Sequence, residues 1–222
     1  MRISTSTLAV LRSFSSINQR LLIQPGNVLE IESPAGVRAR AVVPEQFPVQ
    51  IAIYDLGKFL AVCDLFHEPG LDFRTNFVRI TESDGKAEAV YAYSPPSLIR
   101  RVTFKDSLTP PDATVEFELP EDALDAVQRA AIVLNTNHVS FLSDGKAVQM
   151  ALCDRSNPNK RLFSVSLTAE PNGFRYESIF DMTNLRLVKG SYRVVLTNHR
   201  GSFKNTSGYD LTYWVACDVR QC

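Results

Sequence analysis

Apolar residues recur at every third position near the start of the chain: Leu8, Leu11, Phe14 and Ile17. This spacing is typical of an amphipathic helix, and Ser4 or Thr5 can cap its first turn. We therefore predict a helix through about residue 18. Its other face carries small residues, and Arg12 projects from that face.

Short runs of strand-forming residues follow this helix. Turn sequences such as Pro25-Gly26-Asn27 and Pro34-Ala35-Gly36 separate them. We predict strands at residues 20–24, 28–32, 38–43 and 49–54, a short helix over 55–65, and further strands at 71–73, 78–81 and 87–93. The Asp84-Gly85-Lys86 turn joins the last two as a hairpin.

The plan restarts after a connector with prolines at both ends, SPPSLIRRVTFKDSLTPP. We predict an N-terminal domain at 1–94, a connector at 95–111 and a C-terminal domain at 112–222. The second domain is expected to hold a strand at 114–119 and a helix from Pro120 to about residue 135. That helix has an apolar stripe of Leu124, Val127, Ala131 and Leu134. Strands at 139–142, 147–153, 162–168 and 174–180 follow. A short helix over 181–188, strands at 191–197 and 209–219, and a polar loop between these two complete the domain.

One short cassette occurs in both halves. Ile53-Tyr54-Asp55-Leu56 with Phe59 aligns with Ile179-Phe180-Asp181-Met182 and Leu185. In each copy a β-rich run ends at an Asp that can cap the start of a short helix. The repeat predicts an α+β chain in which one unit is built twice, with helices at matching places.

Composition narrows the class of protein. The 222 residues are 45% apolar and 22% charged, as in globular proteins, and no apolar run approaches the length of a membrane span. Polar residues interrupt the N-terminus too early for a secretory signal, which predicts an intracellular protein. With 24 basic and 24 acidic residues, the chain is unsuited to gripping nucleic acid over its whole surface.

No catalytic or metal-binding pattern is present in the sequence. The histidines His67, His138 and His199 have no neighbour at metal-ligand spacing, and neither a G-x-S-x-G nor a Walker A motif occurs. Asp55 and Asp181 recur in the cassette, but helix capping explains them without a substrate. We predict no enzymatic activity, no cofactor, and reduced thiols at Cys63, Cys153, Cys217 and Cys222.

Cations on or beside the predicted helices are the candidate chemistry: Arg12, Arg20, Lys58, Arg129, Arg186 and Lys189. Each alone is most often a solvated surface charge. If the helices share one side of the sheets, however, these charges converge there. A basic face on a neutral protein would contact phosphates without reading bases.

Four segments make the chain similar to a known family: TLAVLRSFSSIN, AIYDLGKFL, VEFELPEDALDAVQRA and FDMTNLRLVKGSYRVVL. In these, and in the order of its hairpins, the chain resembles the sliding clamps (DNA polymerase processivity factors) of T-even-type bacteriophages. The resemblance implies two tandem DNA-clamp domains of the processivity fold, with helices on the inner face and β-sheets outside. It also implies that three protomers close head to tail into a ring.

The resemblance implies a function and partners. The ring would encircle double-stranded DNA without sequence preference, after an ATP-dependent clamp loader places it there, and would tether the replicative DNA polymerase. In T-even phages the clamp also supports late transcription through factors associated with RNA polymerase. The implied location is the cytoplasm of the infected bacterial host, with no membrane partner.

The same resemblance assigns three groups of residues. The channel would be lined by Arg12, Arg20, Lys58, Arg129, Arg186 and Lys189. The ring contact would join strand 87–93, with Ala89, Tyr91 and Tyr93, to strand 162–167 of the next protomer, with Phe163, Val165 and Leu167. A partner peptide would dock near the connector at Leu98, Ile99 and Val102.

A hypothesis from another class stays open at this point. The neutral charge and the absence of a reaction site also suit a two-domain, β-rich interaction or virion structural protein that never touches DNA. The arrangement of charge discriminates the two, because the DNA hypothesis requires the helices to share a face.

Overall fold

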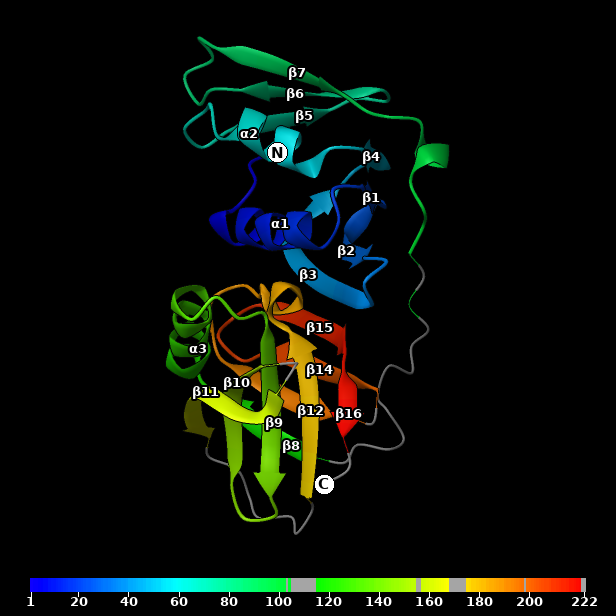
Figure 1. Cartoon of the computed structure of the whole chain (residues 1–222). Helices are drawn as coiled ribbons and strands as arrows, with labels where there is room; N and C mark the ends of the chain where they lie inside the picture. Colours follow the sequence, from blue (N-terminus) through cyan, green and yellow to red (C-terminus); the bar gives the residue numbers. More distant parts are fainter. Residues whose placement is uncertain (103, 105–114, 155–156, 168–174, 198, 221–222) are drawn as a thin grey trace. The chain divides into compact units, whose positions relative to one another are not determined.

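The computed structural model describes residues 1–102, 104, 115–154, 157–167, 175–197 and 199–220 (Figure 1). The chain divides into two compact units. The first comprises 1–33, 38–104 and 209–211, and the second comprises 34–37, 105–208 and 212–222. Cys222 and connector residues 105–111 lie outside the described residues, so the predicted boundaries at 94 and 112 stay predictions.

Unit 1 begins with the predicted helix, α1 (Thr5–Ile17). The Ser4 hydroxyl accepts a hydrogen bond from the backbone N–H of Thr7, which confirms the predicted cap. The buried stripe is Thr7, Val10, Leu11 and Phe14, whereas Leu8 and Ile17 are only half-buried. The stripe lies one position earlier than predicted because a threonine occupies one of its buried places.

The polar group that holds Thr7 in the core is Glu45. This carboxylate is 8% exposed and accepts hydrogen bonds from the Thr7 hydroxyl and the Ser4 backbone N–H. Burial raises the pKa of Glu45, but these hydrogen bonds lower it more, so the pKa lies below the ordinary value. Glu45 thus fixes the start of α1 to a strand far along the chain.

Replacing Glu45 with Gln is expected to lower the free energy of unfolding by about 1–3 kcal/mol at pH 7, because charged hydrogen bonds to buried groups are lost. A carboxylate with a lowered native pKa stabilises the fold above its unfolded pKa of roughly 4.3, and that stabilisation is lost as the pH falls through the native value. Denaturant titrations should therefore show the difference between wild type and variant shrinking below about pH 4. The matched change at exposed Glu88 should cost under about 0.5 kcal/mol at either pH.

The remaining elements of unit 1 follow the predicted order: β1 (Leu21–Ile23), β2 (Gly26–Glu32), β3 (Val37–Phe47), β4 (Ile51–Ile53), α2 (Leu56–Cys63), β5 (Gly70–Phe73), β6 (Phe77–Thr81), β7 (Glu88–Ala92) and the 3₁₀ turn η1 (Pro96–Leu98). β1 pairs with β4, β2 pairs with β3, and β5-β6-β7 form a three-stranded sheet, all antiparallel. α2 packs on α1 and on β7. The predicted hairpin at 84–86 is confirmed, and Gly85 there has φ +72°.

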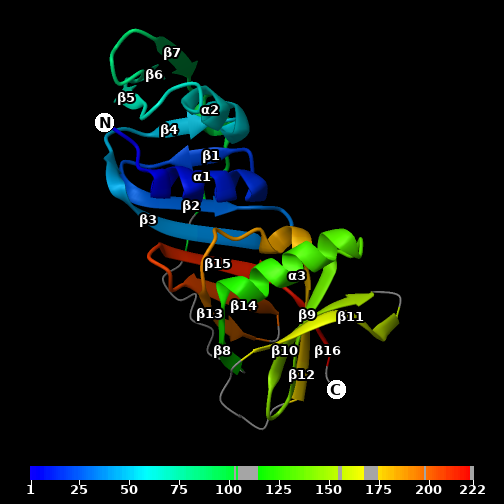
Figure 2. The same ribbon diagram turned by 90° about the vertical axis from the view of Figure 1, so that its left-hand side faces the viewer.

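Unit 2 is built from two antiparallel sheets. Its elements are β8 (Val115–Leu119), α3 (Glu121–Val133), β9 (His138–Asp144), β10 (Val148–Asp154), β11 (Asn157–Leu167), β12 (Arg175–Asp181), the 3₁₀ turn η2 (Met182–Leu185), β13 (Tyr192–Leu196), β14 (Arg200–Asn205), β15 (Asp210–Ala216) and β16 (Asp218–Arg220). One sheet has the order β11-β10-β9-β12-β16, and β15, β14, β13 and β8 are neighbours in the other. α3 packs on β10 and β11 (Figures 1 and 2).

Aromatic side chains fill the core of unit 2. The rings of Phe141 and Phe180 have centroids 5.6 Å apart at 83°, and those of Phe180 and Phe203 lie 5.8 Å apart at 78°. Such edge-to-face pairs add to the gain from burying the rings. Gly201 leaves room for them, because a Cβ there would approach atoms of Phe203 and Phe180 to 2.8 and 2.9 Å.

Two predictions for unit 2 are wrong. Residues 181–188 do not form a helix comparable to α2, because the structure has only the short turn η2, from Met182 to Leu185. The polar loop expected between 197 and 209 contains strand β14, in which Gly201, Phe203 and Asn205 face the core. A strand with one large apolar residue and a glycine at inward positions has too little alternation to be recognised.

The predicted stripe of α3 needs a smaller correction. Ala123, Leu124, Val127 and Ala131 are buried, but Leu134 follows the helix and is 42% exposed. The helix stops at Val133, and Asn135 turns the chain with φ +48°. None of the helices within the described ranges combines the length and apolar composition that a membrane span requires.

Candidate functional site

The aspartates of the repeated cassette are helix caps. Asp55 Oδ1 accepts a hydrogen bond from the Lys58 backbone N–H at 2.8 Å, and Asp181 Oδ1 accepts one from that of Thr183 at 2.8 Å. The predicted role of both residues is therefore confirmed. Among the described residues, no group of three His, Cys, Asp or Glu side chains could hold a metal ion.

The described cysteines are thiols placed in or near the core. Cys63 and Cys153 are buried, and Cys217 is partly buried. Burial raises the pKa of Cys63 to about 12 and that of Cys217 to about 11, so neither is a ready nucleophile near neutral pH.

The two helices of unit 1 lie side by side. The Gly57 backbone N–H donates to Gln19 Oε1 at 2.8 Å, and the Leu56 N–H donates to the Gln19 carbonyl at 2.9 Å. Arg12 of α1 forms an ion pair with Asp64, the residue that follows α2. The second cation, Arg20, has its guanidinium 4.5 Å from the Tyr54 ring centroid and donates to Tyr54 Oη of a neighbouring ring at 2.7 Å.

These contacts divide the three predicted cations of unit 1. Arg12 and Arg20 are exposed but already have partners, whereas Lys58 on α2 is exposed and forms no ion pair with any residue that the structure describes. The sequence did not indicate Asp64 or Tyr54 as partners, although Tyr54 occupies the aromatic position of the cassette. The free charge of the helix pair thus comes mainly from Lys58.

In unit 2 the helix and the 3₁₀ turn are also neighbours. Gln128 Nε2 of α3 donates to the Leu185 carbonyl of η2 at 3.1 Å. Arg129, Arg186 and Lys189 are all exposed around this contact. In the part of the chain that the structure describes, Arg129 and Lys189 form no ion pair. Each unit therefore brings its predicted cations to one helical side.

The first predicted assembly strand, β7, is a free edge of its sheet. The Tyr93 N–H donates to the Asn76 carbonyl and the Glu82 N–H to the Ala87 carbonyl, both at 2.9 Å. Because antiparallel pairs alternate, the backbone groups of Glu88, Val90 and Ala92 point away from β6. β7 thus offers unpaired donors and acceptors along one side.

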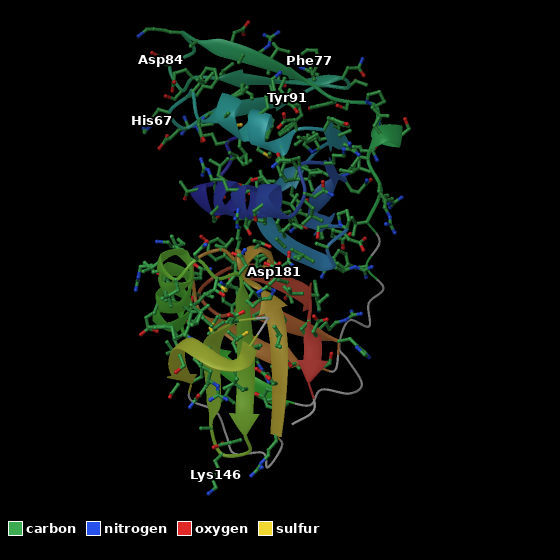
Figure 3. The ribbon with its side chains drawn as sticks, in the orientation of Figure 1. His67, Phe77, Asp84, Tyr91, Lys146 and Asp181 are labelled. Atoms are coloured by element: carbon green, nitrogen blue, oxygen red, sulfur yellow. The ribbon has the colours of Figure 1, made fainter. Side chains whose placement is uncertain are left out.

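The side chains of β7 alternate in the same way. Tyr91 packs edge-on against Phe59 of α2, with ring centroids 5.3 Å apart, so the face with Ala89, Tyr91 and Tyr93 carries the helix (Figure 3). Burial raises the pKa of Tyr93 to about 12. The predicted assembly residues of β7 are therefore half-buried under α2, and Val90, on the other face, is 58% exposed.

The second predicted assembly strand, β11, is the edge of the five-stranded sheet. Phe163, Val165 and Leu167 share one of its faces, with exposure falling from 37% at Phe163 to 6% at Leu167. Both assembly strands are thus edges with a helix nearby, and unpaired edges are templates for pairing with another chain.

The predicted partner pocket has mixed exposure. Leu98 in η1 is 54% exposed, Val102 is half-buried and Ile99 is 6% exposed. Ile99 thus belongs to the core, and Leu98 offers an apolar surface beside it.

Relatives of the chain are found among phage proteins. It is 25% identical to the sliding clamp of Vibrio phage KVP40 over 99% of this chain and 100% of that protein. It is 24% identical to the sliding clamp of Escherichia phage RB69 and 22% identical to that of Enterobacteria phage T4, over 88% of this chain and 87% of each of those proteins. No family model matches the sequence.

Solved structures share the fold. The PCNA2–PCNA3 complex of Sulfolobus tokodaii has a chain with a TM-score of 0.67 and 11% identity, which covers 96% of this chain and 95% of that one. Proliferating cellular nuclear antigen of Entamoeba histolytica gives 0.67 with 10% identity over 96% and 94%. The predicted fold class and the predicted resemblance are confirmed: the chain is a relative of phage sliding clamps, with the α+β fold of two tandem DNA-clamp domains.

Proposed function

We propose that this protein is a DNA polymerase sliding clamp: three copies close head to tail into a ring around duplex DNA and tether the replicative polymerase. The observation that carries the proposal is the similarity to phage sliding clamps along the whole chain, on a clamp fold. Head-to-tail contacts of one kind close into a ring when the rotation between copies is a fraction of a turn. The protein itself catalyses no reaction.

The charges suit a ring that slides. Each unit gathers cations on its helical side, and the chain as a whole is neutral. Weak contacts to phosphates are sequence-independent, and a few of them permit motion along the duplex, whereas a strongly basic chain would bind too tightly. Tethering raises the effective concentration of polymerase at the primer end without a tight DNA site.

The finer parts of the proposal follow from the same similarity. The six cations Arg12, Arg20, Lys58, Arg129, Arg186 and Lys189 face the DNA, β7 of one copy pairs with β11 of the next, and Leu98, Ile99 and Val102 contact a partner peptide. An ATP-dependent loader opens and places the ring in the cytoplasm of the infected bacterial host, where the clamp also supports late transcription. The rival hypothesis of a virion protein gains no support from relatives that are sliding clamps.

A primer-extension assay tests the function. The cognate polymerase and loader are mixed with primed circular DNA, and excess unlabelled primer-template traps any polymerase that dissociates. Adding the clamp with loader and ATP should lengthen the product of a single binding event many-fold. Unchanged product length at every clamp concentration, with an active polymerase, would contradict the proposed function.

A further inference from the structure

The C-terminal end of α3 exposes two large apolar side chains. Ile132 is 81% exposed and Val133 is 83% exposed, although the helix has a well-buried stripe elsewhere. Successive helical residues are about 100° apart, so these two side chains lie on different sides of the helix. Exposed apolar groups at one place indicate a contact surface.

The neighbours of α3 show which side faces the edge of the sheet. Gln128 hydrogen-bonds to the Leu185 carbonyl, so its flank faces η2, which follows β12. Ala126, Ala130 and Val133, at i, i+4 and i+7, share the opposite flank. The sheet order is β11-β10-β9-β12 and α3 packs on β10 and β11 (Figure 2), so this flank looks out over the free edge at β11.

Val133 also lies near the exposed aromatic residue of that edge. Just past α3, Thr136 Oγ1 donates to the Cys153 carbonyl of β10 at 3.1 Å. Leu152, beside Cys153, is opposite Phe163 of β11, which is 37% exposed. The end of α3 and Phe163 thus form an apolar corner at the β11 edge.

The other assembly edge has a matching corner. α2 packs on β7, the ring of Phe59 contacts that of Tyr91, and the helix ends at Cys63. Leu65, two residues beyond, is 74% exposed. Each edge strand is therefore accompanied by a helix whose C-terminal end leaves a large apolar side chain in water.

We propose that these corners meet, so that Val133 and Phe163 of one copy pack against Leu65 of the next copy, beneath the joined strands β7 and β11. The inference rests on the proposed ring. A register with Tyr91 opposite Phe163 or Val165 places both helix-bearing faces on the same side of the joined sheet. Strands are about 4.8 Å apart, so helices over strands on either side of the seam lie roughly 10 Å apart, a normal packing distance. The small side chains of Ala126 and Ala130 allow that approach.

The test compares aspartate substitutions on the two sides of α3. Sedimentation equilibrium of the full chain should show that Val133→Asp and Leu65→Asp raise the protomer concentration for half-assembly by roughly tenfold or more, because the contact would bury an unpaired charge. Ile132→Asp is the matched control: it has equal exposure on the flank that does not face the next copy, and it should assemble like wild type.

The outcomes separate this inference from the ring itself. A wild-type trimer with an unweakened Val133→Asp, or equal weakening by Ile132→Asp, would overturn the helix contact and leave the ring. A wild-type protein that stays monomeric at every concentration would overturn both. If Val133→Asp loses its folded circular dichroism spectrum, the variant with Leu65→Cys and Val133→Cys decides instead: oxidation should cross-link protomers through these positions, and the absence of cross-links in the trimer would overturn the contact.

Discussion

Replacing Val90 with proline is expected to abolish trimer formation while the protomer stays folded. The Val90 N–H points away from β6, so proline there removes no hydrogen bond within the sheet of unit 1. It does remove a donor from the edge that would pair with β11, and its ring obstructs the incoming strand. A cost of about 3 kcal/mol per contact raises the protomer concentration for half-assembly by roughly two orders of magnitude.

Light scattering coupled to size exclusion measures this effect as a fall from about three times the 24.8 kDa protomer mass to that of a single protomer. Val90→Thr is the matched control, because threonine keeps both the N–H and the β-branched shape, and it should remain trimeric. Thermal unfolding reports whether the proline variant folds. A folded Val90→Pro protein that is trimeric at the same concentrations as wild type would rule out β7 as an assembly edge.

Reversing the charge at Lys58 and Lys189 together is expected to reduce clamp-dependent DNA synthesis by roughly tenfold or more at physiological salt, with the trimer intact. These lysines lie on the helical sides of units 1 and 2 and are exposed without ion-pair partners among the described residues. Their replacement by glutamate turns attraction for phosphates into repulsion in every protomer of the ring. The primer-extension assay measures the loss, and lower salt should not restore it.

The control carries the same number of reversed charges elsewhere. Lys86 and Lys146 sit in the two Asp-Gly-Lys hairpin turns, and Asp84 and Lys146 mark the turn ends in Figure 3. Lys86→Glu with Lys146→Glu should leave synthesis within about twofold of wild type, because these turns lie away from the helices and their charges are screened beyond about 10 Å. Equal loss in both double variants would show a general charge effect and would remove the helical cations from the channel.

Local signals made the helices of the first unit predictable. The Ser4 cap, the apolar spacing of α1 and the cap at Asp55 each act within a few residues, so the sequence alone contains them. The Asp-Gly-Lys hairpin was predictable for the same reason, because a positive φ at Gly85 is a local requirement.

The repeated cassette was predicted only in part. The capping aspartates match, and Leu56 and Phe59 are buried in one copy as Met182 and Leu185 are in the other. The aromatic position differs: Tyr54 is 43% exposed beside Arg20, whereas Phe180 is 1% exposed in the core of unit 2. The partners of this position are distant in the sequence, so similar letters could not reveal that their surroundings differ.

Distant contacts also explain the missed features of the site. The pairing of Arg12 with Asp64 joins residues from two helices, and the register that holds Gly201 near Phe180 depends on sheet order. Likewise, the exposure of Val133 depends on where α3 lies on its sheet, which spacing cannot give. The sequence predicted which residues are charged or apolar, and the packing determines which of them remain available.

The most direct test of the central claim is topological. Labelled clamp is loaded with loader and ATP onto a nicked DNA circle, the DNA is separated from free protein by gel filtration in high salt, and the DNA is then cut at one site. A ring around the duplex is held without tight contacts, so the account predicts that clamp stays with the circle and leaves after linearisation. Clamp that is retained equally on circular and linear DNA, or on neither, would contradict it.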